Sequence, residues 1–434
     1  MNILLINSNL HHKHGLIDQL LYKLNSNPIL VLQQIAAATP KNHSLKLIDD
    51  KYDSPFYDGK IDLVGISAVT PSAPRAYKIA DYYRRKGAPV VLGGMHASAL
   101  PEEAKQHADS VVIGEAEMLW PQLIKDFELG KIKPFYRCDK PVDPKSIKCP
   151  RHDLLRIPPL FTAVAPSRGC PYNCSFCTLT HLHGQNYRQR PVEKVIQEIK
   201  NTSRKILVFL HDSALTIDKN YAKSLFKAMI PLRKKFIAYG TLPSLLDDEL
   251  LKLSNKAGCV VWCLGFETIC NDSLKKDANK AYSIEKYESV CRRIHKFDMN
   301  IFGSFAFGFD NDEPNIFEDT LQAAYDFGLD AAEFNILTPF PITRLFHKFN
   351  NEGRILTKDW EKYDLRHVVF QPKKMTIKEL YDGITNVSLK FYSPLKTIQR
   401  ITNVAFKTRK FSNILIMGAM NTVMLRFHRE FSPN

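Results

Sequence analysis

The chain has 434 residues, more than one ordinary domain holds, and suits two or three domains. Its composition, 44% apolar and 24% charged with 11% aromatic residues, is that of a soluble globular protein and excludes a wholly disordered chain. The opening MNILLINSNL lacks a basic leader region, and no apolar run reaches the ~18 residues of a spanning helix. We therefore expect a cytoplasmic protein.

Basic charge is concentrated near the C-terminus. The net charge is +15, and from Arg366 onward twelve Lys and Arg stand against three acidic residues. Such a tail is typical of a nucleic-acid contact, of an anionic membrane contact, or of a solvated face, which is the simplest interpretation.

Residues 1–130 predict a parallel sheet with helices between its strands. Short apolar runs indicate strands, and stretches of helical periodicity separate them. We expect strands over Asn2–Ser8, Ser44–Ile48, Leu63–Ser67, Pro89–Leu92 and Ser110–Ile113, and helices over Pro28–Ala38, Ala73–Arg85 and Ala116–Phe127. This alternation is typical of a doubly wound α/β domain, whose ligands bind at the carboxyl ends of the strands.

The rest of the chain predicts a linker, a partial barrel and a helical extension. Residues 131–160 hold six prolines among charged residues without periodicity, which indicates a linker. Residues 161–345 predict a partial (β/α)6 barrel with its active site at the carboxyl ends of the strands. Its strands are expected near 162–166, 206–210, 236–240, 259–265, 300–306 and 332–337. Residues 346–434 predict a basic helical region, with helices over Thr376–Lys390, Lys396–Phe406 and Asn413–Phe427.

Three of the nine cysteines lie close together, in SRGCPYNCSFC directly after the first expected barrel strand. Cys170, Cys174 and Cys177 have the spacing C-x3-C-x2-C. Three thiolates on one short loop can hold three irons of a [4Fe–4S] cluster and leave the fourth iron open. The alternative is zinc, with a fourth ligand from His181 or His183. The later cysteines lack a cluster spacing, and we expect Cys259, Cys263, Cys270 and Cys291 to be inert.

This segment resembles the signature of the radical S-adenosylmethionine (SAM) superfamily, C-x3-C-x-Φ-C, with Phe176 as the aromatic Φ. The resemblance covers about residues 160–345. It implies an enzyme in which SAM chelates the open iron, and one electron cleaves SAM to a 5′-deoxyadenosyl radical that abstracts hydrogen from carbon. The protein then holds its cofactors in register and excludes water. An external donor of the reduced flavodoxin or ferredoxin type would supply the electron, and no catalytic acid or base is identifiable.

The same resemblance implies further SAM contacts at three strand ends. Asp212 ends the second barrel strand, where relatives often carry an acidic group. Glu267 lies in LGFET, which looks like the family element G-[VIF]-E-[ST], and its carboxylate suits ribose hydroxyls or an amino group. The alternative for Glu267 is an acidic residue at a helix N-terminus. Gly308, in FAFGFD, resembles the fifth-strand glycine that approaches adenine, although core packing explains the phenylalanines equally well.

The front sheet resembles the cobalamin-binding domain found ahead of many radical SAM domains. By this resemblance Ser67 and Thr70 would hydrogen-bond the nucleotide tail, Gly93 and Gly94 would let the backbone approach the ligand, and Gly114 and Glu115 would line the same crevice. His96 would approach the cobalt or cap its turn.

The front domain departs from the motif D-x-H-x-x-G, whose histidine ligates cobalt from below, because His11, His12 and His14 lack the leading Asp. Cobalamin would then bind without that ligand, or the domain would hold no cobalamin. The methylthiotransferase branch is excluded, since its front domain needs cysteines and the first here is Cys138.

Together these features predict a cobalamin-dependent radical SAM methyltransferase that acts on an unactivated carbon, with a [4Fe–4S] cluster, SAM and cobalamin as cofactors. The alternatives are a radical cyclase, oxidase or rearrangement enzyme, and a zinc or iron–sulfur protein that binds nucleic acid; no nucleic-acid partner is expected. The substrate would be a small molecule or a lipid. The apolar, basic-flanked run SNILIMGAMNTVMLRF is consistent with an enzyme peripheral to the inner face of the membrane, with a barrel cap or with a dimer contact.

Overall fold

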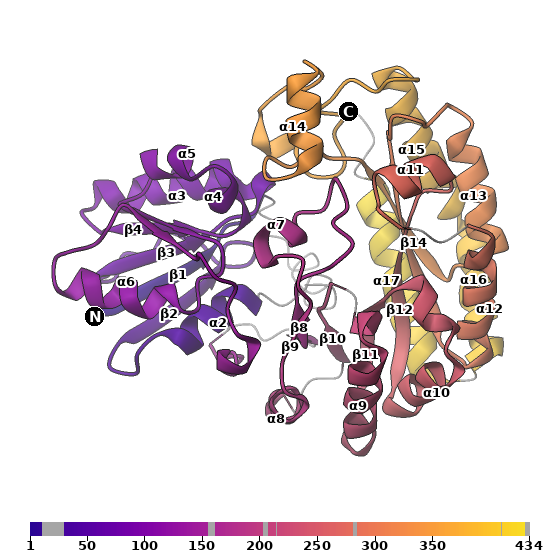
Figure 1. Cartoon of the computed structure of the whole chain (residues 1–434), viewed down its shortest axis with the longest axis horizontal. Coiled ribbons are helices and arrows are strands. Elements are labelled where there is room, and N and C mark those ends of the chain that lie inside the picture. Colours follow the sequence, from indigo (N-terminus) through magenta and orange to yellow (C-terminus); the bar gives the residue numbers. More distant parts are fainter. Residues whose placement is uncertain are drawn as a thin grey trace.

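The computed structural model describes residues 1–10, 30–154, 161–202, 207–213, 215–280, 284–408 and 410–429. Two six-stranded parallel sheets, each with its own helices, organise these residues (Figure 1). The expected α/β architecture with a helical C-terminal extension is confirmed. His11, His12, His14 and the first two residues of the expected helix Pro28–Ala38 lie outside the described residues.

The front sheet has the strand order β2-β1-β3-β4-β5-β6. Its strands are β1 (Asn2–Asn7), β2 (Ser44–Asp49), β3 (Leu63–Ser67), β4 (Val90–Gly93), β5 (Ser110–Ile113) and β6 (Phe135–Arg137). The order reverses beside β1, and in sheets of this type the crevice at such a reversal binds ligands. The short apolar runs form strands because both faces are covered.

Helices cover both faces of the front sheet. They are α2 (Leu30–Ala38), α3 (Ala73–Arg85), α4 (Met95–Ala99), α5 (Pro101–Gln106) and α6 (Leu119–Glu128), with the 3₁₀ turn η1 (Thr70–Ser72). The helices α3, α4 and α5 pack on one face, through residues such as Ile79 and Ala104. The helices α2 and α6 cover the other face through Ile35 and Trp120.

The segment expected to be an irregular linker contributes a strand. β6 pairs in parallel with β5 at the edge of the front sheet, with Val112 opposite Tyr136. Tyr136 is buried, and its hydroxyl donates to Asp126 at 2.8 Å. The 3₁₀ turn η2 (Pro144–Ser146) follows, with Asp143 as its cap. The first part of this segment is therefore an edge strand of the front sheet, and the part around η2 also contacts β9 of the cysteine loop.

The second sheet is the expected partial barrel, open between its two edge strands in the described part of the chain. Its order is β14-β13-β12-β11-β10-β7, all parallel. The strands are β7 (Phe161–Val164), β10 (Leu207–Leu210), β11 (Lys235–Gly240), β12 (Cys259–Glu267), β13 (Asn300–Phe307) and β14 (Ala331–Ile336). A separate antiparallel pair, β8 (Ser167–Arg168) and β9 (Arg188–Gln189), was not expected.

Helices cover the outer face of the barrel sheet and form the largest core of the described residues. They are α8 (Val192–Asn201), α9 (Lys219–Met229), α10 (Asp248–Ala257), α11 (Asn271–Lys276), α12 (Glu285–Lys296) and α13 (Ile316–Asp326). Short 3₁₀ turns join several of them: η3 (Leu215–Ile217), η4 (Ile230–Leu232) and η5 (Leu242–Leu246). Asp218 and Asp247 cap α9 and α10 by accepting backbone N–H groups.

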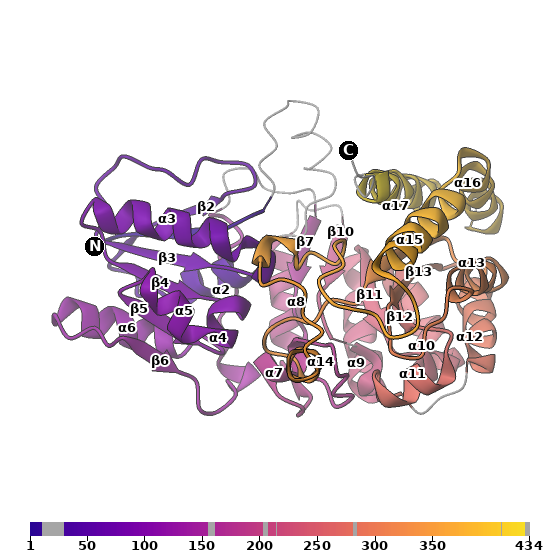
Figure 2. The same cartoon turned by 90° about the horizontal axis from the view of Figure 1, so that it is seen from above.

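The last two C-terminal helices cover the inner face of the barrel sheet, and the helix before them joins the outer layer. After α14 (Arg344–Asn351) and η6 (Trp360–Lys362) come α15 (Ile377–Phe391), α16 (Pro394–Thr408) and α17 (Phe411–Arg429). Figure 2 shows α16 and α17 on one side of the barrel strands and α9–α11 on the other. α15 packs beside α13 in the outer core, through Leu380 and Ile384. Val404 of α16 and Met417 of α17 are buried in one cluster with Val261 of β12. None of the described helices is long and apolar enough to cross a membrane.

Candidate functional site

The three clustered cysteines lie on one loop that a short strand pair closes at its base. β8 precedes the loop and β9 follows it, with Arg168 directly opposite Arg188. Within the loop, α7 (Leu179–His183) begins soon after Cys177. Figure 1 shows α7 and α14 between the two sheets, so the loop lies on the side of the barrel that faces the front sheet.

Backbone contacts fix the path of the loop. Gly169 has a φ of +85°, a conformation that side-chain-bearing residues rarely adopt. The next N–H, of Cys170, donates to the carbonyl oxygen of Gly184 at 3.2 Å. Ser175 donates its N–H to Asp277 at 2.7 Å and accepts the N–H of Leu345 at 2.9 Å. The loop is thus held by its own base and by two later segments of the barrel.

The thiols of the loop are set in partly apolar surroundings. Cys174 is buried and its Sγ donates to the carbonyl oxygen of Ala278 at 3.0 Å, while Cys170 and Cys177 are half-buried. Burial raises the pKa of all three thiols, that of Cys174 to about 12, and the nearby cation Lys280 opposes this for Cys170 and Cys174. Within the described ranges, no three Cys, His, Asp or Glu side chains are gathered into a ready-made metal site. The fit to an iron–sulfur cluster therefore rests on the chemistry of the donors. Iron in such clusters is bound by thiolates, and this loop carries three thiols that can supply them.

Asp212 and Glu267 lie at the carboxyl ends of β10 and β12, two strands of the barrel sheet with β11 between them. Asp212 follows β10, is buried, and accepts the Ser167 hydroxyl at 2.5 Å, which ties the second strand end to the start of the cysteine loop. Glu267 ends β12 with a φ of +64°, where the register between β12 and β13 shifts. A left-handed non-glycine residue costs roughly 1–3 kcal/mol and is typical of functional sites.

Lys280 holds the Glu267 carboxylate in place. Its Nζ lies 2.8 Å from Glu267 Oε1 and donates to the carbonyl oxygen of Gly265 at 2.8 Å. A Cβ on Gly265 would lie 2.3 Å from Glu267 Oε1, so only glycine leaves room for the folded-back carboxylate. Since α11 begins four residues later, Glu267 does not act as an acid in a first helical turn. Sequence reasoning missed Lys280, for which no motif gives a signal.

Phe176 connects the cysteine loop to the glycine segment after β13. Its ring packs edge-on against Phe309, with 5.8 Å between the ring centroids. Gly308 has a φ of +104°, and a Cβ there would lie 2.8 Å from Phe370 Cζ. The missing side chain of Gly308 therefore makes room for Phe370, which is a packing role. Asp312 accepts the N–H groups of Gly308 and Phe309 at 2.9 and 3.0 Å and shapes this turn.

Three loops of the front sheet meet at the carboxyl ends of β3, β4 and β5. A Cβ on Gly94 would lie 2.7 Å from the Ala68 carbonyl oxygen, so this loop packs directly on the Ser67–Thr70 loop. The Ser98 hydroxyl accepts the Gly114 N–H at 2.9 Å and donates to the Gly94 carbonyl oxygen at 2.8 Å. The sequence-predicted residues Ser67, Thr70, Gly93, Gly94 and Gly114 are thus brought together.

Two polar atoms of this site are buried without a hydrogen-bond partner among the described residues: the Thr70 hydroxyl and Nδ1 of His96. Such groups cost free energy unless a ligand or a water satisfies them. An unsatisfied hydroxyl at the ligand-binding edge suits the polar tail of a nucleotide-bearing cofactor. The front loops therefore fit cobalamin by this observation.

His96 joins the front sheet to the C-terminal region. Its Nε2 lies 3.1 Å from Glu103 Oε1, which also accepts the Tyr77 hydroxyl at 2.9 Å and Trp360 Nε1 at 3.0 Å. Burial favours the neutral acid, but hydrogen bonds from His96 and Tyr77 hold the pKa of Glu103 below its ordinary value. The indole of Trp360 also packs edge-on against the His96 ring. No motif pointed to Glu103 or Trp360 as partners of His96.

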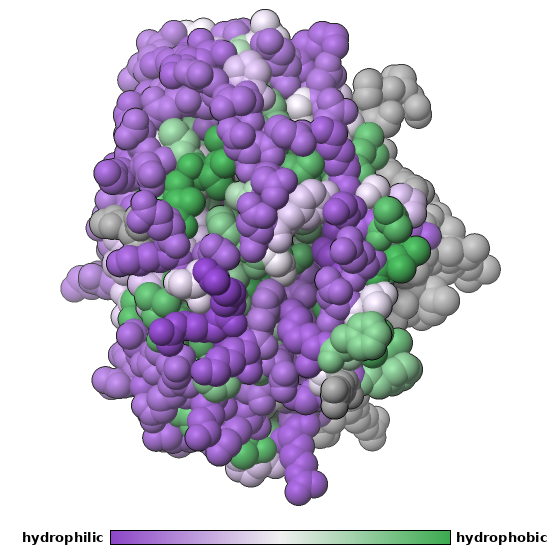
Figure 3. Space-filling model, turned by 90° about the vertical axis from the view of Figure 1, so that its right-hand side faces the viewer, coloured by the Kyte–Doolittle hydropathy of each residue, from purple (hydrophilic) through white to green (hydrophobic). Residues whose placement is uncertain are grey.

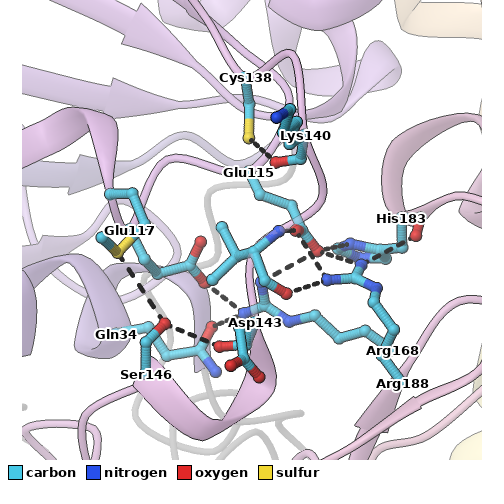
Figure 4. Close-up of polar contacts among 12 residues, drawn as sticks. Gln34, Glu115, Glu117, Cys138, Lys140, Asp143, Ser146, Arg168, His183 and Arg188 are labelled. Atoms are coloured by element: carbon cyan, nitrogen blue, oxygen red, sulfur yellow. Dashed lines mark hydrogen bonds and ion pairs between the residues drawn. The ribbon is translucent and has the colours of Figure 1, made fainter.

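Glu115 is surrounded by two arginines and a histidine from the two ends of the cysteine loop (Figure 4). Its carboxylate lies 2.8 Å from His183 Nδ1 and from an Arg188 guanidinium nitrogen, and 3.1 Å from Arg168. Burial opposes ionisation, yet hydrogen bonds from His183 and Arg188 and the charge of Arg168 hold the pKa of Glu115 well below its ordinary value. These three partners of Glu115 were not expected, although Arg168 lies inside the SRGC motif.

The remaining cysteines do not join this site. Cys259, Cys263 and Cys291 are buried, and burial raises the pKa of each thiol, as expected for inert residues. Cys270 is half-buried at the start of α11. Cys138 contacts the site indirectly, since a Cβ on Gly114 would lie 3.2 Å from Cys138 Cβ.

Comparison with known proteins assigns families to both sheets. The model of the radical SAM superfamily matches residues 164–324, and that of the B12 binding domain matches residues 43–124. Bacteriochlorophyllide d C-8(2)-methyltransferase of Chlorobaculum tepidum is 31% identical over 424 residues, which cover 88% of this chain and 92% of that protein. Anaerobic magnesium-protoporphyrin IX monomethyl ester cyclase of Cereibacter sphaeroides is 29% identical over 76% of this chain and 60% of its own length.

A solved structure shares the fold over the whole chain. The radical SAM methyltransferase TsrM of Kitasatospora setae, solved with cobalamin and a [4Fe–4S] cluster, superposes with a TM-score of 0.71 at 15% identity and covers 99% of both chains. At this identity the similarity shows the fold alone.

Proposed function

This chain belongs to the radical SAM superfamily, in the group with a B12 binding domain ahead of the barrel, and we propose that it methylates an unactivated carbon of a small organic substrate. That it is a radical SAM enzyme follows from its family. One observation carries the further step to methyl transfer: the similarity to bacteriochlorophyllide d C-8(2)-methyltransferase over 88% of this chain. The direct contact between the front sheet and the cysteine loop, through Glu115 and Arg168, would serve that transfer.

The cofactors supply chemistry that the side chains lack. When bound, the [4Fe–4S] cluster and SAM supply a carbon radical, and methylcobalamin supplies the methyl group. We propose that Cys170, Cys174 and Cys177 hold the cluster. Cys174 must then exchange its hydrogen bond to Ala278 for iron, and Lys280 offsets the negative charge of the thiolates.

Within the barrel, residues at the strand ends would orient SAM. The Glu267 carboxylate, fixed by Lys280, offers acceptor lone pairs to an amino group or to ribose hydroxyls. Asp212 would act from the end of β10, with β11 between it and the strand of Glu267. Phe176 would act from the cysteine loop, and Gly308 from the end of β13. The C-terminal helices exclude water from the barrel, as radical chemistry requires.

In the front domain, the buried Thr70 hydroxyl and Ser67 would bind the nucleotide tail, and Gly93, Gly94 and Gly114 would bring backbone close to the ligand. His96 Nδ1 has no hydrogen-bond partner among the described residues and would donate or accept at the same ligand. Glu115 would line the crevice only from the side, since its oxygens are taken up by His183 and the two arginines.

The alternative activity is a radical cyclisation. The relative from Cereibacter sphaeroides is named a cyclase, and it matches 76% of this chain at 29% identity. A cyclase would cleave SAM without transferring a methyl group, so the two activities differ in a measurable product.

The test is anaerobic reconstitution with iron, sulfide and hydroxocobalamin, followed by metal counting and by incubation with methyl-labelled SAM and candidate substrates. About four irons and one cobalt per chain, with label transferred to an organic product, support the methyltransferase. Deoxyadenosine without label transfer to any product favours the cyclase. Absence of both iron and deoxyadenosine contradicts the whole assignment. Reduced flavodoxin or ferredoxin would serve as electron donor.

We propose further that the outer faces of α16 and α17 contact an anionic membrane surface. Leu395, Ile398 and Phe406 are 76, 63 and 76% exposed along one side of α16, and Phe411 and Leu415 of α17 are 73 and 57% exposed. No Asp or Glu lies between Asp382 and Glu430, whereas eight Lys and Arg do. Figure 3 shows apolar groups among hydrophilic ones on the side of the molecule where α16 lies. Such a surface suits anionic headgroups over a lipid interface.

The membrane proposal needs substitutions rather than truncation, because α17 also packs on the barrel through the buried Met417. The double change Phe406→Ser with Phe411→Ser should reduce sedimentation with phosphatidylglycerol vesicles and leave cluster loading intact. Phe56→Ser, an exposed aromatic of the front domain, is the control. Equal vesicle binding by the double variant and the wild type would show that these helices pack on the barrel and do not contact a membrane.

A further inference from the structure

Glu115 connects the front sheet to both ends of the cysteine loop. It follows β5, and its partners lie on either side of the cluster cysteines: Arg168 before them, His183 and Arg188 after them (Figure 4). Its second oxygen accepts an Arg188 N–H at 3.1 Å and the Val142 N–H at 2.6 Å. A single carboxylate therefore holds the barrel loop and the segment after β6 at once.

The two arginine partners of Glu115 belong to the strand pair at the base of the cysteine loop. Arg168 and Arg188 stand opposite each other in the β8–β9 pair, which closes the base of the cysteine loop. Arg168 also lies 3.1 Å from the Gln34 amide oxygen and pairs with Glu117. Arg188 donates to the carbonyl oxygens of His183 and Val142. Any shift of Glu115 relative to this base breaks several contacts together.

Charge and burial make the connection specific. The side chains of Glu115, Arg168 and Arg188 are 3, 9 and 14% exposed, and two carboxylates, Glu115 and Glu117, balance the two guanidiniums. A buried ion pair contributes little net stability, but it costs much to break because a bare charge is left in low dielectric. Paired guanidinium nitrogens also set direction as well as distance. The arrangement is therefore suited to holding the cysteine loop at one distance and orientation relative to Glu115.

We propose that Glu115 is a positioning residue that sets where the cysteine loop sits relative to the front sheet, and hence the spacing between the cluster and the cobalamin. This rests on the proposed function for the identity of the two cofactors. It gives Glu115 a role distinct from the cobalamin contact implied by its strand-end motif.

The test compares Glu115→Gln with Asp330→Asn in the full-length chain. Glutamine keeps the shape of Glu115, but its NH₂ group faces the N–H donors of Arg188 or His183. Asp330 is a matched control: it is buried, lies 3.0 Å from His295 and 3.1 Å from Lys407, and accepts the Ile301 N–H at 2.9 Å, all within the barrel unit.

The first readout is hydrogen exchange, which needs no cofactor. Glu115→Gln should speed exchange of the amides in segments 138–146 and 183–190 by about tenfold, the change expected when one charge-assisted hydrogen bond is lost. Asp330→Asn should leave both segments unchanged. Unchanged exchange in Glu115→Gln would overturn the proposal. If that variant does not fold, Glu115→Asp, which keeps the charge but shortens the reach, takes its place with the same expectation.

The second readout is the magnetic coupling between the reduced cluster and cob(II)alamin in reconstituted protein, measured as relaxation enhancement by pulsed electron paramagnetic resonance. Glu115→Gln should load iron and cobalt as the wild type does and yet weaken or broaden this coupling. Equal coupling in the two proteins would contradict the proposal. If the wild type binds no cobalt, the proposed function fails, and hydrogen exchange still decides whether Glu115 holds the loop.

Discussion

Replacing Gly169 by alanine should displace the cysteine loop. Gly169 lies between Arg168 and Cys170 at a φ of +85°, and an added Cβ would lie 2.1 Å from the Asn186 carbonyl oxygen. Real Cβ contacts do not come this close, and the obstacle is backbone on the far side of the loop. Either Asn186 or Gly169 must move, and Cys170 moves with them.

The magnitude follows from two separate costs. A left-handed alanine costs roughly 1–3 kcal/mol, partly offset by about 0.4–1 kcal/mol from the stiffer unfolded chain. The clash adds about 1–3 kcal/mol, as other overpacked sites do. Gly87→Ala is the matched control, because Gly87 has a φ of +79° with nothing within 4 Å of the added Cβ. The difference between the two variants isolates the clash.

The assay is iron per chain after anaerobic reconstitution, combined with hydrogen exchange over residues 170–187. Exchange is preferable to a single melting temperature because a chain of several domains does not unfold in one step. Gly169→Ala should lose most of its iron and exchange faster in this loop, while Gly87→Ala should match the wild type in both. If the two variants behave alike, the close packing at Asn186 does not hold the loop.

Three further predictions concern other parts of the site. Cys174→Ala should abolish the cluster absorption and deoxyadenosine formation. Cys291→Ala changes another buried cysteine and should keep both. Retained absorption in Cys174→Ala would show that Cys174 is not a cluster ligand. Burial raises the pKa of Asp312 to about 7, so its ionisation should destabilise the folded chain as the pH rises from about 4 to 7. The hydrogen-exchange protection of the amides of residues 305–312 should fall over this range in the wild type but not in Asp312→Asn, and parallel pH curves in the two proteins would contradict this. Trp360→Phe keeps an aromatic ring but removes the N–H that donates to Glu103. It should weaken the docking of the C-terminal region by about 1.5–3 kcal/mol, measured as faster hydrogen exchange over residues 355–370. Exchange equal to the wild type would show that ring packing suffices.

The strands of both sheets were predictable because each is a short apolar run covered on two faces. The expected strand near 300–306 is β13, Asn300–Phe307, and the expected strand near 332–337 is β14, Ala331–Ile336. β6 was not predictable. It has three residues, lies among prolines, and is a strand only because it pairs with the edge of β5. β8 and β9 have two residues each and carry no periodicity at all.

The candidate site was predictable where one residue type at a fixed spacing carries the signal, as in Cys170, Cys174 and Cys177. Partners were not predictable, because a charge does not specify its counter-ion along the chain. Glu115 and Arg188 are separated by 73 residues, and Trp360 and Glu103 by 257. Only the packing of the two units brings such pairs together.

The placement of β6 changes how this enzyme can be recombined with its relatives. A chimera cut at residue 130 would take β6 from one parent and β5 from the other, and would separate Val142 from the carboxylate of Glu115. A cut beyond residue 154 would carry the whole front sheet, its edge strand and the Val142 contact as one inherited piece. Exchange of front units between methyltransferases and cyclases at this cut would keep each sheet whole. The contacts of Glu115 with Arg168, His183 and Arg188 would then be the ones that join residues of different parents.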